Sequence, residues 1–346
     1  MSINISNLFL AFNLNYILTD TLKLGFAYAL VALGIFISFR VLDIPDLTAE
    51  GSFTLGGALS AFLLVMDWNP WIATLMGMIA GFGAGVITGL IHTKLHVSGL
   101  LSGIITMTGL FSLNLIIMGF APKVSTVNDE LVVTFTEGGY AATVPLMYRN
   151  IHGEYIRTIY STFSLYIVNN NLRIILIGLS ITILFVGLLY LIFGTKIGMS
   201  IRATGINPHM ARAQGINTNL MIILGLGISN ALIAVGGACF AQVQGSASST
   251  MGVGVLVLGL ASIIMGEAII GKKHFWQWLL AMVGGSIAYY LIIVLAIQLG
   301  LPTFYQKLLY AILILIVLSV TLFKEVLTSK HRKNAISEGD NNVKSK

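Results

Sequence analysis

Hydrophobic residues occur in long runs that are separated by short polar stretches. About 20 apolar residues cross the hydrocarbon core of a bilayer as a helix, and these runs lack the two-residue alternation typical of strands. Because lipid offers no hydrogen bonds to the backbone, the pattern predicts an all-α, polytopic membrane protein with about 8–9 transmembrane helices. The expected spans are residues 20–39, 51–66, 70–91, 97–119, 173–193, 218–240, 252–270, 277–299 and 307–323.

Composition supports a chain whose surface faces lipid. Of 346 residues, 56% are hydrophobic and 9% are charged, whereas soluble domains carry about 25% charged residues. The net charge of +6 comes from basic residues in short clusters between the apolar runs. Such clusters are typical of membrane topology, so no nucleic-acid partner is expected. The single cysteine, Cys239, excludes an internal disulfide and a cysteine-based metal site.

The runs divide the chain into five segments. These are an N-terminal segment (1–19), a first helix-bundle half (20–119), an extracytoplasmic loop (120–172), a second half (173–323) that includes a cytoplasmic loop (194–217), and a disordered basic cytoplasmic tail (324–346). The loop 120–172 carries both signs of charge. It is either a solvated loop without a special role or a docking surface for an outside partner.

Lysine and arginine in short loops predict the orientation, because they concentrate on the cytoplasmic side. If every predicted span crosses, nearly all loop cations fall on one side, which is then cytoplasmic. The same parity places the N-terminus outside, unless residues 40–66 re-enter the membrane instead of crossing it. The cations are Arg40, Lys94, Lys196, Arg202, Arg212, Lys272, Lys273 and those after residue 323.

The loop 194–217 contains the start and stop signals of a short helix. Asn207 is a good N-cap and Pro208 suits the first helical position. Gly215 suits the left-handed residue that follows a helix. The predicted helix, residues 208–214, is too short to persist alone in water. We therefore expect it to lie against a cytoplasmic protein, with Met210, Ala211 and Ala213 as apolar contacts; a capped loop helix without a partner is the alternative.

Five stretches in order resemble the branched-chain amino-acid and ribose type of ABC permease, and most closely the permeases implicated in tryptophan, tyrosine or other amino-acid uptake. The resemblance covers nearly all of residues 20–323, whereas the loop 120–172 departs from the family in length and composition. The stretches are FRVLDIPDLTAEGSFTLGGA (39–58), WNPW (68–71), HTKLHVSGLLSGIITMT (92–108), SIRATGINPHMARAQGIN (200–217) and GLASIIMGEAIIG (259–271).

The resemblance implies a type II-like ABC importer permease fold in the plasma membrane. It implies a homodimer of permeases, two ATPase subunits and an extracytoplasmic solute-binding lipoprotein. The chain itself would need no cofactor, since ATP is used by the partner, and it would not be an enzyme. Candidate ATPase-coupling residues are Arg202, Thr204, Gly205, Asn207, Pro208, Met210, Arg212 and Gly215.

Polar residues at membrane depth are the candidates for a translocation path or gate, because ionisable groups there are costly. Four of the five have a structural alternative. Asp46 would cap the helix that begins near Leu47, Glu267 would form an inner-face salt bridge or cap near Lys272 and Lys273, and the amides would bond between helices. If the polar turn lines the path, helix N-termini would attract a substrate carboxylate. The candidates are Asp46, Glu50, Asn114, Asn230 and Glu267.

Three further patterns remain: one predicts helix packing, and two resemble ligand-binding motifs without meeting their requirements. Glycines repeat every four residues from Gly77 to Gly89, which predicts a smooth stripe against another helix. GEAIIGKK at 266–273 approaches a phosphate-binding loop, but Lys273 replaces the required Ser or Thr. His92 and His96 have a metal-binding spacing without an intervening carboxylate, so they are interpreted as interface residues and no metal site is predicted.

The sequence therefore predicts the membrane-spanning permease subunit of an ATP-driven importer for a small solute, an amino acid of the aromatic or a related type. The alternative is a self-contained secondary transporter or channel, which would need charged relays within its spans. A membrane enzyme is disfavoured because no catalytic constellation is evident.

Overall fold

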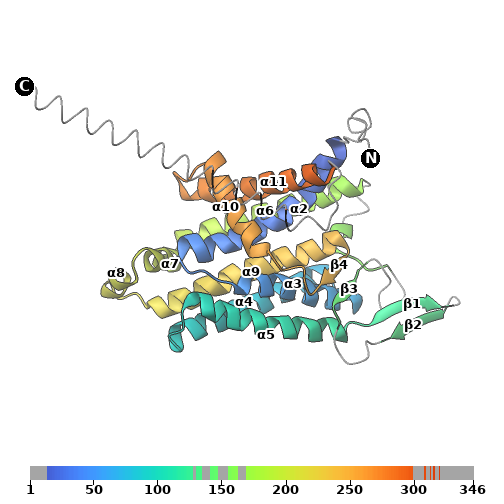
Figure 1. The fold of residues 1–346 in the computed structure, drawn as a ribbon, viewed down its shortest axis with the longest axis horizontal. Coiled ribbons are helices and arrows are strands. Elements are labelled where there is room, and N and C mark those ends of the chain that lie inside the picture. Colours follow the sequence, from blue (N-terminus) through green and yellow to red (C-terminus); the bar gives the residue numbers. More distant parts are fainter. Residues whose placement is uncertain are drawn as a thin grey trace, which may run out of the picture.

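The computed structural model describes residues 14–127, 130–134, 141–146, 155–162 and 169–298, together with four single helical positions between 308 and 319. It is an elongated bundle of roughly aligned helices (Figure 1). Seven helices among the described residues are long and apolar enough to cross a membrane. This confirms the predicted polytopic, all-α class. The ninth predicted span (307–323) and the tail (324–346) lie largely or wholly outside the described residues.

Seven of the observed helices follow predicted spans closely, whereas α7 lies in the predicted loop 194–217 and was not predicted. Most differ by a few residues at the ends, where polar caps extend the helix beyond its apolar run. The helices are α2 (Leu14–Phe36), continued by the π-helical turn η1 (Ile37–Val41), α3 (Thr48–Val65), α4 (Pro70–Lys94), α5 (Gly99–Phe120), α6 (Asn170–Gly194), α7 (Lys196–Ile206), α8 (Pro208–Ala213), α9 (Thr218–Gln244), α10 (Val255–Ile269) and α11 (Phe275–Gln298).

Helix α10 is shorter than its predicted span of 252–270. It has 15 residues, because Gly252 and Val253 lie in a turn and Gly254 has a positive φ of 88°. This left-handed conformation suits glycine and marks the start of the helix. At about 1.5 Å per residue, α10 falls short of a full crossing by itself.

Helix α9 is the centre of the bundle and packs against α2, α3 and α4 (Figure 1). Gly81, Gly85 and Gly89 of the predicted glycine stripe lie on this contact, whereas Gly77 lies against Gly56 of α3. A Cβ at Gly81 would lie 2.6 Å from the carbonyl oxygen of Asn230, and one at Gly89 would lie 2.8 Å from Cα of Ile223. Both distances are too short for a real side chain, so only glycine permits this approach of the two backbones.

Residues 42–65 run through the bundle from one end to the other. Val41 lies against Gly205 of α7, whereas α3 begins inside, where the Thr48 and Thr88 hydroxyls are 2.7 Å apart. Helix α3 then continues to the turn before Pro70. The segment therefore crosses and does not re-enter, which agrees with the parity assumed from the sequence.

The two ends of the bundle differ (Figure 1). The end that carries α8 is here called the α8 end. The opposite end, here the β end, carries a hairpin of β1 (Lys123–Val127) and β2 (Glu130–Thr134) in which Val127 pairs with Glu130. It also carries β3 (Thr143–Pro145), which pairs antiparallel with β4 (Ser246–Ser248) after α9. These strands lie within the predicted loop 120–172 and beside α9, and the sequence analysis did not predict them.

Gln242 fastens this loop to the helices at the β end. Its Nε2 donates to the hydroxyls of Ser60 at 3.0 Å and Thr74 at 2.9 Å. Its Oε1 accepts the backbone N–H of Ile159 at 2.9 Å, in the short helix η2 (Ile159–Ser161). The amide is buried and fully paired, so it holds α3, α4, α9 and the loop in one arrangement.

Candidate functional site

Helix α8 is a short, well-capped helix at one tip of the molecule. The Asn207 side chain accepts the backbone N–H groups of His209 at 3.1 Å and Met210 at 3.0 Å, and Pro208 occupies the first turn. At the other end Gly215 has φ 82°. The N–H of Gly215 bonds the Arg212 carbonyl and that of Ile216 bonds the Ala211 carbonyl, at 2.9 and 3.1 Å. This pair of hydrogen bonds is a Schellman motif. The predicted start signal at Asn207 and Pro208 and the predicted stop signal at Gly215 are therefore both confirmed.

The tip exposes apolar side chains. Ile206 is 85% exposed and Met210 is 63% exposed. Ala211 is only 3% exposed, so the expectation that it offers an outward contact was wrong: the Ala211 face of α8 packs on the chain itself. Lipid covers the apolar surface of membrane spans, but α8 lies at one tip of the bundle (Figure 1). Exposed apolar groups outside lipid are typical of surfaces that contact another protein.

Helix α7 joins this tip to the rest of the bundle. The guanidinium of Arg202 lies 4.7 Å from the centroid of the Phe275 ring at the start of α11. Gly205 touches the backbone of Val41 at the end of η1, and Thr204 is buried with its hydroxyl on the Ser200 carbonyl at 2.8 Å. Of the eight candidate coupling residues, Thr204 and Gly205 therefore face the protein, whereas Arg202, Asn207, Pro208, Met210, Arg212 and Gly215 are exposed.

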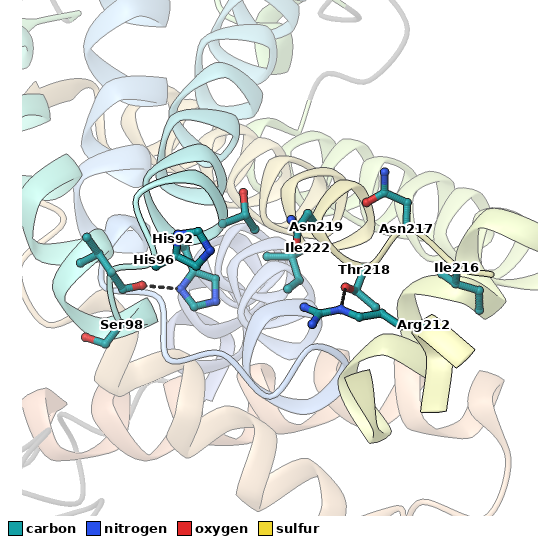
Figure 2. Close-up of a pocket in the computed structure, with 11 residues that line it drawn as sticks. His92, His96, Ser98, Arg212, Ile216, Asn217, Thr218, Asn219 and Ile222 are labelled. Atoms are coloured by element: carbon teal, nitrogen blue, oxygen red, sulfur yellow. Dashed lines mark hydrogen bonds between the residues drawn. The ribbon is translucent and has the colours of Figure 1, made fainter. Parts of the chain in front are cut away.

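A groove of about 680 Å³ separates α8 from the α4–α5 turn (Figure 2). Arg212 lines the groove, and its Nε donates to the Thr218 hydroxyl at 2.7 Å (Figure 2). On the other wall Nδ1 of His92 lies 2.7 Å from the Val97 carbonyl oxygen. The lining residues are His92, Thr93, His96, Val97, Ser98, Arg212, Ile216, Asn217, Thr218, Asn219 and Ile222.

The groove was not predicted from the sequence, although two of its lining residues are of types that favour the N-cap position of a helix. Ser98 and Asn217 cap α5 and α9: their side chains accept the N–H groups of Leu101 and Leu220. Cap residues predict where a helix begins, but they do not predict that two helix starts face each other. Both histidines lie in the groove wall, and no cluster of three metal-binding side chains occurs among the described residues.

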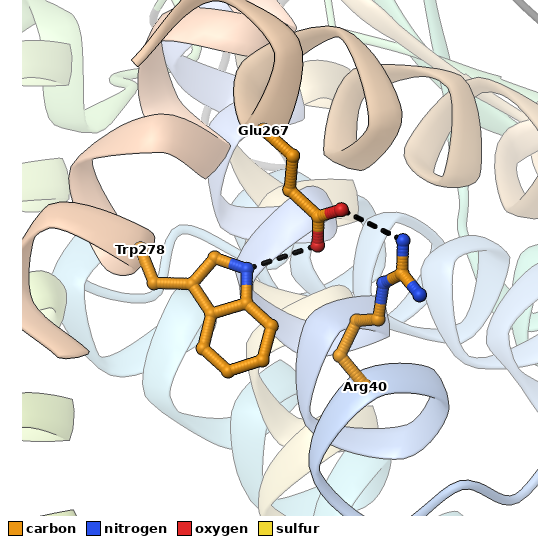
Figure 3. A network of polar contacts seen from close by, with 3 residues as sticks. All are labelled: Arg40, Glu267 and Trp278. Atoms are coloured by element: carbon orange, nitrogen blue, oxygen red, sulfur yellow. Dashed lines mark hydrogen bonds and ion pairs between the residues drawn. The ribbon is translucent and has the colours of Figure 1, made fainter. Parts of the chain in front are cut away.

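Glu267 forms an ion pair at the α8 end (Figure 3). Its Oε2 accepts from a guanidinium nitrogen of Arg40 at 2.8 Å, and its Oε1 accepts the indole N–H of Trp278 at 2.9 Å. The side chains of Arg40 and Glu267 are 41% and 12% exposed. The network links η1, α10 and α11. It corresponds to the salt bridge weighed from the sequence, but the partner is Arg40 and neither Lys272 nor Lys273.

Asp46 and Asn230 meet near the middle of α9. The Asn230 amide donates to Oδ2 of Asp46 at 2.6 Å, and the backbone N–H of Thr48 donates to Oδ1 at 2.9 Å. Both side chains are completely buried. Asp46 thus holds the start of α3 in place and ties it to α9, and neither residue lines the groove beside Arg212.

Glu50 and Asn114 line a different space, a cavity of about 220 Å³ between α3, α5 and residues 249–253. Glu50 accepts the backbone N–H of Gly254 at 2.9 Å. Asn114 donates to the Gly51 carbonyl at 3.2 Å, which is the interhelical bond favoured from the sequence. The remaining lining is Gly51, Thr54, Met107, Thr108, Phe111, Ser249, Gly252 and Val253.

The apolar spans define a multi-pass membrane protein. Residues 17–318 match the family described as "Branched-chain amino acid transport system / permease component". The chain belongs to this family of ABC permeases.

Two curated relatives show how far the similarity extends. The chain is 35% identical over 287 residues to the "Tyrosine transport system permease protein" of Clostridioides difficile, covering 83% of this chain and 85% of the relative. It is 24% identical over 266 residues to the "Probable branched-chain amino acid transport permease protein LivH" of Methanocaldococcus jannaschii, covering 76% and 77%. No solved structure matches the chain significantly.

Proposed function

We propose that this chain is the permease subunit of an ATP-driven importer, and that α8 is the handle through which a separate ATPase moves it. The observation that carries the proposal is the exposed, doubly capped tip with Ile206 and Met210 on its surface. A helix of 6 residues needs its caps and a partner to persist in water. The α8 end carries the loop cations Arg40, Lys94 and Arg212, so we assign it to the cytoplasm.

The contacts of α7 supply a route for the force. A displacement of α8 would be transmitted to η1 through the contact between Gly205 and Val41. It would be transmitted to α11 through the stacking of Arg202 on Phe275. The network of Arg40, Glu267 and Trp278 joins η1 to α10 and α11 at the same level. These helices would then tilt together. Alternating access needs two such packed arrangements, which ATP binding to the partner would favour in turn.

The assembly would hold two copies of this chain, two ATPase subunits and an extracytoplasmic solute-binding lipoprotein, with membrane lipid around the helices. The named relatives support an amino-acid substrate, and the "Tyrosine transport system permease protein" supports an aromatic one. A self-contained secondary carrier would use neither an ATPase nor an exposed α8. The chain has no catalytic role of its own in this proposal.

The test is a crosslink between α8 and the ATPase together with reconstituted transport. Met210→Cys should crosslink to a cysteine in the copurified ATPase, whereas Tyr155→Cys, exposed on the other end, should not. Proteoliposomes with all three components should take up tyrosine only with ATP. Uptake by the purified chain alone, or crosslinking from the opposite end, would contradict the proposal.

A further inference from the structure

A second groove, of about 380 Å³, lies along the side of the bundle between α4 and α6, and Ala231 of α9 lies in its floor. It is here called the apolar groove. Its walls run from Trp71 to Phe82 on α4 and from Ile181 to Ile192 on α6. Each wall is therefore about 16 Å long, at about 1.5 Å per residue. All three helices are long and apolar enough to cross a membrane, so the groove lies within the membrane-spanning part of the protein.

The rims of the apolar groove continue into the outer surface of the spans. Leu75 on one wall and Leu184 on the other are 48% and 62% exposed. Beside them, Ile79 and Ile183 are also more than half exposed, outside the groove. Apolar side chains on the outer surface of a membrane span contact the hydrocarbon of the bilayer. The groove is therefore a hollow in a lipid-facing surface.

The lining of the apolar groove has no free hydrogen-bonding group apart from the indole of Trp71. Thr74 is the one residue with a hydroxyl among the described lining residues. This hydroxyl donates to the Pro70 carbonyl at 3.0 Å and accepts Nε2 of Gln242 at 2.9 Å. No charged side chain of the described chain lines the groove. A polar solute would lose its hydrogen bonds to water here without replacement, so the lining suits a hydrocarbon.

The apolar groove is too narrow for a transmembrane helix. A helix with its side chains is about 10–12 Å across, so 16 Å of it occupies on the order of 1,300–1,800 Å³. The groove has a volume of about 380 Å³. A helix from a second copy of the chain would therefore rest on the rims and leave the floor uncovered. A thin, flexible acyl chain can enter the groove and follow its walls.

Trp71 provides a polar contact at one end of the apolar groove. It lies in the first turn of α4, at the β end of the bundle, and is 42% exposed. Its indole N–H has no hydrogen-bond partner among the described residues. Indole groups concentrate where a membrane meets water, with the ring in hydrocarbon and the N–H toward the headgroups. The N–H of Trp71 is thus free to donate to a headgroup oxygen of a lipid whose chain occupies the groove.

We propose that the apolar groove is a specific binding site for one acyl chain of a membrane phospholipid, with the headgroup beside Trp71. The chain would fill the space that separates α6 from α4 above the floor formed by α9. It would thereby support α6, which leads through Thr195 into α7 and the α8 tip. Occupancy of the site requires neither ATP nor solute, so the proposal does not depend on the proposed function.

Photolabelling tests where the acyl chain lies. The permease is placed in phosphatidylglycerol vesicles in which a trace of the lipid carries a diazirine in the middle of one acyl chain. Labelled residues are mapped by mass spectrometry after irradiation. Ala231 in the floor is 9% exposed, whereas Ile183 outside the groove is 61% exposed. Surrounding lipid reaches Ile183 readily, and only a chain inside the groove reaches α9 around Ala231, where we expect labelling. Labelling confined to the outer faces would show surrounding lipid only and would overturn the proposal.

Retention of lipid in detergent tests the strength of binding with a matched pair of variants. Native mass spectrometry of the wild-type chain in dodecylmaltoside should show a retained phospholipid. Leu188 lines the groove and is 42% exposed, so Leu188→Trp enlarges a wall without entering the core. It should lower the retained fraction roughly tenfold, because the indole takes the packing contacts of the acyl chain. Ile183→Trp, on the same helix but outside the groove, should retain as much lipid as the wild type.

A second variant approaches the same space from the floor. Ala231→Phe should reduce retention as Leu188→Trp does, and thermal unfolding of the purified variants checks that each is folded. If Ala231→Phe does not fold, Leu188→Trp and the photolabelling decide. Equal retention in Leu188→Trp and Ile183→Trp, or no retained phospholipid in the wild type, would overturn the proposal. So would a Leu188→Cys chain that forms a disulfide-linked dimer, because a second copy would then occupy the groove.

Discussion

Gly205 is the residue of α7 that packs most tightly against the backbone of η1. A Cβ at this position would overlap the backbone carbonyl oxygen of Val41, and a backbone atom cannot turn aside as a flexible side chain can. The contact between α7 and η1 therefore depends on the absence of a side chain.

Gly205→Ala should separate α7 from η1 and lower tyrosine uptake at least about tenfold while ATP hydrolysis by the complex continues. The expected loss follows because small displacements at a positioning contact have large kinetic effects. Gly194→Ala is the matched control, since a Cβ there meets nothing within 4 Å. Wild-type uptake by Gly205→Ala would show that this contact does not transmit the movement of α8.

Glu267 has two partners that substitutions can separate. Glu267→Gln removes the charge pairing with Arg40 but keeps an acceptor for the Trp278 indole, whereas Glu267→Ala removes both. Arg40 is well exposed, so the ion pair alone contributes about 0–1 kcal/mol. We expect thermal unfolding in detergent to show almost no change for Gln and a clear decrease for Ala. A larger decrease for Gln than for Trp278→Phe would mean that the ion pair dominates the network.

At the scale of elements, the α4–α9 contact depends on one face of α4. Gly81, Gly85 and Gly89 meet the backbone of α9, while Gly83 lies on another face and its Cβ would meet nothing within 4 Å. The same helix therefore contains both a test position and its control, within two residues of each other.

Gly85→Leu should prevent the close approach of α4 to α9 and destabilise the protein by at least about 1–3 kcal/mol, the cost of overpacking. Gly83→Leu should be nearly neutral because its side chain points away from the bundle. Thermal unfolding of the two purified variants measures the difference. Equal stabilities would show that the helices adjust without cost.

The elements also show what the sequence could and could not predict. Apolar runs and the cap at Asn207 determine helices locally, so seven of the nine spans, the start of α8 and its glycine stop were predicted correctly. The partner of Glu267 is 227 positions away in Arg40, and its choice depends on how η1, α10 and α11 pack. The groove beside Arg212 and the cavity at Glu50 arise from the same packing, which periodicity does not contain.

At the scale of the whole molecule, the two ends are predicted to face opposite compartments. Met210 marks the α8 end and Tyr155 the β end, and both are exposed, at 63% and 77%. The native thiol of Cys239 is buried and stays silent. Single cysteines at the two positions therefore report the orientation directly.

A membrane-impermeant maleimide should label Tyr155→Cys in intact cells and Met210→Cys only after the membrane is opened. The expectation follows from the loop cations at the α8 end. Labelling of the wild-type chain is the background. The reverse pattern would place α8 outside the cell, where a cytoplasmic ATPase could not bind it.

The pairing of β3 with β4 joins the loop at the β end to the wall of the cavity beside Glu50. Strand β4 leads within a few residues to Ser249, Gly252 and Val253, so the outer loop and the wall of the Glu50 cavity belong to one short stretch of chain. If a protein that binds at the β end displaced β3, either the hydrogen bonds between β3 and β4 would break or that wall of the cavity would move with the strands. Only a few residues thus separate the strand pair at the β end from the wall of the cavity beside Glu50.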